Sequence, residues 1–336
     1  MDKFILCNQE LDNRLNMIKD FLDFVNVQKE NKIFRTPIIY NAVIISIYGC
    51  FENYIDDLFD EYLDEIYKLS EKYEELPQKI KDKHIVKTGE FITNPNRYQN
   101  YGLSVDEVIF NLCNSINNTE NAELNKKLIL THSGNLKIDV IIKLMEELGI
   151  ESAIDKIIFD NDFLDYYCNM HELGKNNAKK RINERKKDDK NELFGEWQRL
   201  VEQRNSVAHS WVVEERISYS SINSAIIPFV KLLGKVILNV ILSEILFVYQ
   251  DKNMLKKITS IYCIYDNKIL CFNNNSARLQ VGTFVYAKNE KGWIVLKILN
   301  IQVNKRSIQK IEDDNMDIGV LVDKHIKKNW EYYYCL

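Results

Sequence analysis

The sequence predicts a mainly α-helical protein, a multi-helix bundle followed by a small C-terminal all-β barrel domain. Glycine and proline are scarce, with 11 and 4 residues among 336, which favours long helices. Apolar residues recur at helical spacing up to about residue 250, and from about Leu255 onward β-branched and aromatic residues alternate in short runs. The hydrophobic content of 46% is ample for real cores, and a chain of this length suits two domains.

Two helices with different patterns are predicted first. Residues 1–28 carry apolar side chains at helical spacing, which indicates an amphipathic helix. Thr36 followed by Pro37 is typical of an N-cap with proline at the first helical position, and a very long helix is predicted from there to about Ser70. Its half at residues 38–51 is apolar nearly all round, which predicts burial on more than one side, whereas its second half is acidic.

The middle of the chain, at about residues 71–190, is predicted to be an insertion added to the outside of the bundle. Its first part is polar and interrupted by glycine and proline, so we expect a continued helix and then an irregular loop. Three shorter helices are predicted to follow, over residues 104–118, about 121–131 and 136–148. Ser104 and Glu107 form a capping-box pattern at the first of them. With the last long helix, predicted over residues 217–249, the helical domain covers residues 1–250.

Residues 255–336 are predicted to form the small barrel domain. Six strands are predicted, at residues 258–265, 268–272, 283–287, 293–303, 318–322 and 332–335. Gly282 and Phe284, the strand that ends at Val303, and the segment from Gly319 to Lys328 are similar to the second-domain barrel of translation factors. That resemblance implies a barrel but not a GTPase, because the sequence has no P-loop.

One segment of the helical part combines a guanidinium, an amide and an imidazole. It reads Arg204-Asn205-x-x-x-His209, and the apolar spacing before it predicts a helix. Asn205 and His209 share a face of an ideal helix, whereas Arg204 and His209 lie about 140° apart around its axis. Arg204 and His209 can therefore converge on one phosphate only if the helix ends or bends there, or if two copies of the chain meet.

These three residue types suit cleavage of RNA by its own 2′-hydroxyl. The reaction needs a base, an acid and a group that stabilises developing negative charge. Arginine grips a phosphate through paired hydrogen bonds, and a neutral imidazole exchanges a proton at about pH 7. An asparagine orients the ring or the phosphate without adding charge. One chain supplies one such histidine, and a symmetric pair of chains would supply two.

The pattern of Arg204, Asn205 and His209, between a helix and a long apolar helix, resembles the Arg-x(4–6)-His signature of the HEPN superfamily of all-α ribonucleases. The resemblance implies a homodimer with the motif at its face and RNA cleavage without metal or cofactor, leaving 2′,3′-cyclic phosphate and 5′-hydroxyl ends. It also implies a toxin or anti-phage defence effector that acts on RNA, with a cognate antitoxin or defence-system partner. Many family members have lost catalysis, so the alternative function is a non-catalytic module that binds nucleic acid or nucleotides. The alternative for Arg204 and His209 is a purely structural role at the end of a helix, with His209 capping carbonyls.

Glu52 is a further catalytic candidate because it stands at the end of an apolar run, where a carboxylate needs a partner or water. In the functional interpretation it faces Arg204 or His209 and orients them. In the alternative interpretation it simply begins the solvated acidic half of its helix.

Two groups of cations are candidates for binding RNA. Residues 175–190 hold eight bases and three acids, a local balance of +5, and phosphate backbones attract such segments. The alternative for this run is a solvated loop. In the last long helix, Lys231, Lys235 and Asn239 recur on an apolar cylinder, and they either line a phosphate path or form its one exposed face. The candidates are Lys179, Lys180, Arg181, Arg185, Lys186, Lys187, Lys231 and Lys235.

Composition excludes several other classes of protein. A net charge of −4 argues against indiscriminate coating of nucleic acid. The seven cysteines, an odd number with none closer than eight residues, indicate reduced thiols in a cytoplasm and no disulfide or zinc-finger scaffold. Four of the histidines lack His or Cys at ligand spacing, so no metal site is predicted. Charges interrupt the most apolar stretch, residues 226–249, and no signal-peptide pattern is visible, so we expect a soluble chain with no membrane partner.

Overall fold

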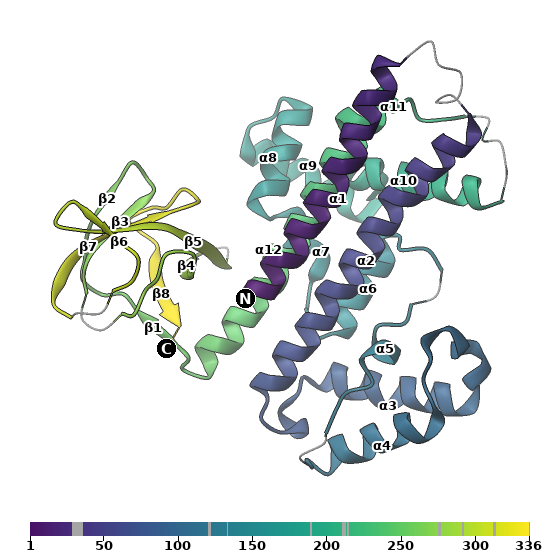
Figure 1. Cartoon of the computed structure of the whole chain (residues 1–336), viewed down its shortest axis with the longest axis horizontal. Coiled ribbons are helices and arrows are strands. Elements are labelled where there is room, and N and C mark those ends of the chain that lie inside the picture. The colour runs from purple at the N-terminus through teal and green to yellow at the C-terminus, as the bar shows by residue number, and fades with distance from the viewer. Residues whose placement is uncertain are drawn as a thin grey trace. The chain divides into compact units, whose positions relative to one another are not determined.

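In the computed structural model, the chain divides into two compact units, residues 1–240 and residues 241–336 (Figure 1). The structure describes residues 1–28, 36–119, 122–132, 134–188, 190–209, 213, 215–274, 277–290, 292–311 and 314–335. Of Asn100, Lys187, Asp188 and Asn191 it describes the backbone alone. The prediction of a HEPN-like helical fold with a small C-terminal β domain is confirmed.

The first unit is helical. Its α-helices are α1 (Asp2–Val27), α2 (Pro37–Leu69), α3 (Gln78–Thr93), α4 (Val105–Ile116), α5 (Lys126–Ile129), α6 (Ile138–Glu147), α7 (Ala153–Ile158), α8 (Asn161–His171), α9 (Lys175–Asp188), α10 (Lys190–His209), α11 (Tyr219–Ser221) and α12 (Ile227–Asp251), which continues into the second unit. Short 3-10 helices span Tyr73–Glu75 and Pro95–Tyr101, and a π-helix spans Ile222–Ile226. The helix predicted at about residues 121–131 is only α5, because Asn125 begins it with non-helical backbone, and α7 and α8 were not predicted.

The long helix α2 is the centre of this unit. It begins at Pro37 as predicted, with Thr36 at the N-cap position, although the Thr36 side chain accepts no capping hydrogen bond. Helices α1 and α10 pack against it. The indole of Trp197 on α10 is fully buried, with its ring 4.4 Å from that of Phe51 and stacked at 5.8 Å on that of Tyr48. This contact fixes the position of α10 along α2.

The last long helix runs from Tyr219 to Asp251 with one irregular turn. The π-helix ends at Ile226, two residues before Pro228, which has no N–H to donate and whose ring crowds the carbonyl one helical turn earlier. Further along, Gly234 allows close packing, because a Cβ built there would lie 2.7 Å from Leu11 Cδ2. The Tyr54 hydroxyl donates to the Gly234 carbonyl at 2.8 Å, which joins α12 to α2.

Two helical stretches, Pro37–Leu69 and Tyr219–Asp251, are long and apolar enough to cross a membrane by composition alone. In the folded chain, 44% and 67% of their most apolar windows are buried. Such burial is what core helices of a bundle also display.

The basic run at residues 175–190 forms helix α9 and the start of α10, so the alternative of a loop is wrong for the described part. Ala178 and Ile182 are fully buried on one side of α9. This small apolar stripe packs against α8 and α10 and gives the charged helix a tertiary anchor.

The second unit is a curled antiparallel sheet, a half-barrel. Its strands are β1 (Leu255–Lys257), β2 (Ile261–Tyr265), β3 (Ile269–Asn274), β4 (Phe284–Asn289), β5 (Gly292–Val303), β6 (Arg306–Ile308), β7 (Met316–Val322) and β8 (Glu331–Cys335). Their order is β1-β8-β4-β5-β7-β3-β2, with β6 on β5. The six predicted strands are confirmed, and β1 and β6 are additional. A register shift at Leu299 lets β5 bend from β4 toward β7, as expected of a bulge.

Candidate active site at the end of helix α10

The three residues of the predicted motif lie in the last turns of α10. Trp197, Leu200 and Val201 form the buried side of this helix, as the sequence predicted. The break in its backbone lies upstream, at Phe194 (φ −121°, ψ 25°). Arg204 and Asn205 are half-buried, and His209, the last helical residue, is exposed.

Arg204 is held on two sides. Its Nη1 donates to the side-chain Oδ1 of Asn135 at 2.7 Å, and its guanidinium carbon lies 4.9 Å from the centroid of the Tyr48 ring. A guanidinium has several N–H donors and no acceptor. The contact with Asn135 uses one of them, so the fixed cation keeps donors for a ligand.

Asn135 also holds the second residue of the motif. Its amino group donates to Asn205 Oδ1 at 2.5 Å. The next residue, Leu136, anchors this segment: its N–H donates to the Tyr48 hydroxyl at 2.7 Å, and its carbonyl accepts from the Trp197 indole at 3.0 Å. The segment before α6 is thereby tied to both α2 and α10.

Glu52 reaches this site through a tyrosine. The Tyr48 hydroxyl, whose ring contacts Arg204, donates to Glu52 Oε1 at 3.2 Å. Burial raises the pKa of Tyr48 to about 12, so the phenol stays protonated and can donate. Within the described part of the chain, no ion pair joins Glu52 to Arg204 or His209. The predicted orienting role is therefore available to Glu52 only by way of Tyr48.

Asp56 extends the acidic edge of the site by one helical turn beyond Glu52. Burial raises the pKa of Asp56 to about 6, the imidazole of His132 acts in the opposite direction, and the negative charge of Glu52 adds to the rise. His132 Nδ1 lies 3.2 Å from the Gly134 carbonyl. Because a carbonyl only accepts, this nitrogen carries a hydrogen and donates it to Gly134.

Sequence reasoning missed Asn135 and Tyr48. Tyr48 precedes Glu52 by one helical turn, so helical spacing alone could have pointed to it. No local signal marks Asn135, which lies 69 residues from Arg204 along the chain.

The cations predicted to bind RNA are mostly engaged with neighbouring acids. Arg181 and Arg185 both pair with Glu192. The Tyr167 hydroxyl donates a hydrogen bond to the same carboxylate. The other pairs are Lys186 with Asp155, Lys231 with Asp12 and Lys235 with Asp162. Lys179 is half-buried, Lys180 is exposed, and the Lys187 side chain lies outside the described residues. None of the described contacts brings these cations to Arg204, Asn205 or His209.

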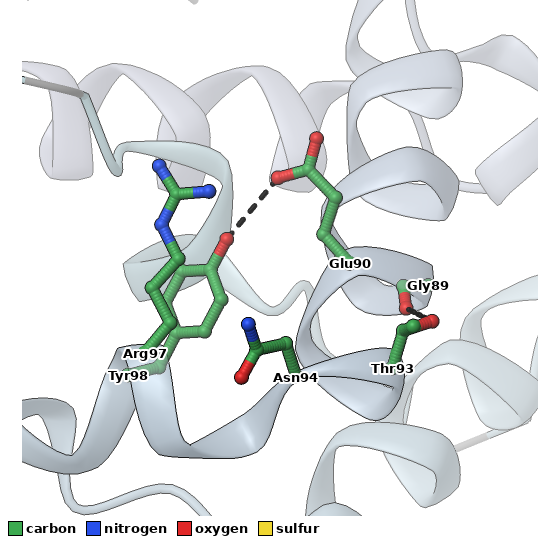
Figure 2. Close-up of a pocket in the computed structure, with 6 residues that line it drawn as sticks. All are labelled: Gly89, Glu90, Thr93, Asn94, Arg97 and Tyr98. Carbon is green, nitrogen blue, oxygen red and sulfur yellow. Dashed lines mark hydrogen bonds between the residues drawn. The ribbon is translucent and has the colours of Figure 1, made fainter.

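Among the described residues, no group of three or more His, Cys, Asp or Glu side chains is arranged to hold a metal ion. A shallow pocket of about 320 Å³ lies at the end of α3 (Figure 2). It is lined by Gly89, Glu90, Thr93, Asn94, Arg97 and Tyr98, with Glu90 accepting from the Tyr98 hydroxyl at 3.1 Å. None of the predicted site residues lines this pocket.

The sequence comparisons identify a family for the helical part of the chain. No curated protein matches the chain. A family model described as RiboL-PSP-HEPN matches residues 9–243, more than two thirds of the chain. The matched part includes Glu52, Asn135 and the Arg204–His209 turn, and it leaves out the β-strands. The chain therefore belongs to the RiboL-PSP-HEPN family of the HEPN superfamily.

Proposed function

We propose that this protein is an endoribonuclease that cleaves RNA by attack of the RNA's own 2′-hydroxyl, without a metal ion or other cofactor. HEPN proteins are generally associated with ribonuclease activity, which supports the proposal at the level of the family. The observation that carries it is the held guanidinium. Arg204 is fixed between Asn135 and Tyr48 on the helix that ends at the exposed His209.

Each residue of the motif has a distinct task in this proposal. The exposed imidazole of His209 exchanges a proton with the reacting oxygens. The donors of Arg204 that do not face Asn135 stabilise the negative charge of the phosphorane. Asn205, next to Arg204 and on the same helix face as His209, orients the phosphate. The products have 2′,3′-cyclic phosphate and 5′-hydroxyl ends.

A homodimer is part of the proposal. The break in α10 lies at Phe194, before both Arg204 and His209, so these two residues leave one regular helix about 140° apart. One chain also offers one exposed imidazole at the motif, whereas the reaction needs a base and an acid. A two-fold pairing of α10 ends would supply both.

The resemblance to the HEPN superfamily also supports a proposal for the biological role. We place the protein among toxins or anti-phage defence effectors that act on cellular or invader RNA, with a cognate antitoxin or defence-system protein as partner. A cytoplasmic location suits its seven free cysteines, because thiols stay reduced there.

The test is cleavage of mixed single-stranded RNA by the purified protein in the presence of EDTA. His209→Ala and Arg204→Ala should each lower the rate by about 10²–10⁴-fold, because each removes a group that acts in the transition state. End analysis of the products should find cyclic phosphates. Arg199→Ala is the matched control, since this exposed arginine on the same helix pairs only with Glu196 among the described carboxylates and should cleave normally.

Other outcomes separate the alternatives. RNA binding without cleavage by the wild type would favour the non-catalytic binding module. Equal degradation by the wild type and both motif variants would mean that a contaminant is responsible, and the enzyme proposal would fall. A monomer at the protein concentrations that cleave RNA, measured by sedimentation, would remove the homodimer.

A further inference from the structure

Asn135 contacts two residues of the candidate active site with the two ends of one amide. Its Oδ1 accepts from Arg204 at 2.7 Å, and its amino group donates to Asn205 at 2.5 Å. We call this set, Asn135 with Arg204 and Asn205, the Asn135 clasp. Asn135 itself is half-buried, and it lies on a segment remote in sequence from α10.

The chemistry of the clasp determines how each amide is turned. Because a guanidinium cannot accept a hydrogen bond, the atom of Asn135 that faces Arg204 must be the oxygen. The Asn135 amino group then faces Asn205, which must present its own oxygen in turn. The amino group of Asn205 is therefore directed away from the clasp, with its donors on the same helix turn as those of Arg204.

The clasp has a rigid base. Leu136, fully buried, uses its N–H and its carbonyl on the Tyr48 hydroxyl and the Trp197 indole. Tyr48 and Trp197 are themselves buried and stacked on each other. Asn135 is thus the side chain through which the core of the bundle fixes the orientation of Arg204 and Asn205.

We propose that Asn135 is a positioning residue of the ribonuclease site: it turns the free N–H donors of Arg204 and Asn205 toward one RNA phosphate before the substrate arrives. This inference rests on the proposed function. Its physical basis is that a fixed, correctly aimed donor costs no reorganisation during the reaction, and that small misplacements of such groups slow catalysis strongly.

The test is a double-mutant cycle between Asn135→Ala and Arg204→Ala. If Asn135 acts through Arg204, Asn135→Ala should lower kcat by about 10–10²-fold in the wild-type background and change it little in the Arg204→Ala background. The same cycle is measured in the affinity for a single-stranded oligonucleotide whose linkages lack the 2′-hydroxyl and cannot be cleaved. This binding measurement tests whether Asn135 acts through Arg204 even for a protein that binds RNA without cutting it.

Asn125→Ala is the matched control. Asn125 is also an asparagine that joins a loop to neighbouring helices, but its partners are Thr88, Asn111 and Val108. Its loss should lower stability and leave kcat, measured well below the melting temperature, near the wild-type value in both backgrounds.

The outcomes separate the two proposals. Wild-type cleavage with an undiminished kcat in Asn135→Ala overturns the positioning role and leaves the ribonuclease proposal intact. Equal effects of Asn135→Ala with and without Arg204 show that Asn135 does not act through Arg204 and also overturn it. Coupling in binding alone, with no cleavage by the wild type, supports the positioning role while the ribonuclease proposal fails. A wild type that neither cleaves RNA nor binds the oligonucleotide overturns both.

Discussion

Two asparagines in the helical unit have the same architectural position and different partners. Asn125 precedes α5, and its amide contacts Thr88, Asn111 and the Val108 carbonyl, while its N–H donates to the ring of His84. Asn135 precedes α6, and its amide contacts Arg204 and Asn205. We call the first set the Asn125 clasp.

The two clasps differ in whether their hydrogen-bond donors are all used, and this difference distinguishes a structural network from one that can bind a ligand. In the Asn125 clasp the partners are neutral and the asparagine is buried, so donors and acceptors satisfy one another. In the Asn135 clasp the asparagine is half-buried, and one partner is a permanent cation with donors to spare. A closed network stabilises a fold, whereas a network that ends in available donors can bind an anion.

The largest effect expected from this comparison is the pH dependence that His84 gives the Asn125 clasp. Burial lowers the pKa of His84 to about 4, below its unfolded value of about 6.5. The unfolded chain thus binds more protons between these values, and stability present above pH 6.5 is lost as the pH falls toward 4. The loss should be about 3 kcal/mol in the free energy of unfolding, measured with urea.

His84→Gln isolates this effect. The variant is expected to be less stable at neutral pH, with a flatter pH profile than the wild type between about pH 4 and pH 6.5. Parallel profiles for the two proteins would mean that the ring is not held neutral. The cleavage rate, in contrast, should depend on the exposed His209 and not on His84.

A smaller effect is expected at the base of the Asn135 clasp. Tyr48→Phe keeps the ring under Arg204 and removes the hydroxyl that accepts from the buried N–H of Leu136 and donates to Glu52. An unsatisfied buried donor costs about 1–3 kcal/mol, so the free energy of unfolding should fall by about 2 kcal/mol.

The same variant tests the route from Glu52 to the site. If Glu52 acts only through the Tyr48 hydroxyl, Glu52→Gln should slow cleavage in the wild-type background and have no further effect beside Tyr48→Phe. An undiminished effect of Glu52→Gln in the Tyr48→Phe protein would show direct action of the carboxylate on the substrate.

The smallest effect concerns Asp56, at the edge of the site. Its folded pKa, about 6, lies above the ordinary value, so stability is fully present below about pH 4 and falls as the pH rises through 6. Asp56→Asn should therefore stabilise the protein at pH 7 and change little at pH 4. Because the side chain is still exposed to solvent, water screens the effect, and we expect a gain below about 1 kcal/mol. Destabilisation at pH 7 would contradict this account.

Much of the fold could be predicted from local sequence. Apolar spacing and the Thr36-Pro37 pair gave the start of α2, and alternating residues gave six strands. Local patterns failed where tertiary contacts decide. Residues 175–188 carry too many charges to signal more than a solvated run, and they are helical because Ala178 and Ile182 pack on neighbouring helices.

The candidate site divides in the same way. The sequence by itself determined the family, the helix of the motif and the chemistry that an arginine, an amide and an imidazole offer, because these features depend on residues within a few turns of one another. Only the tertiary structure brought Asn135 and Tyr48 to Arg204. Their contacts join segments far apart in the chain, and which distant side chains meet is set by how α2 and α10 pack around Trp197, which no local pattern encodes.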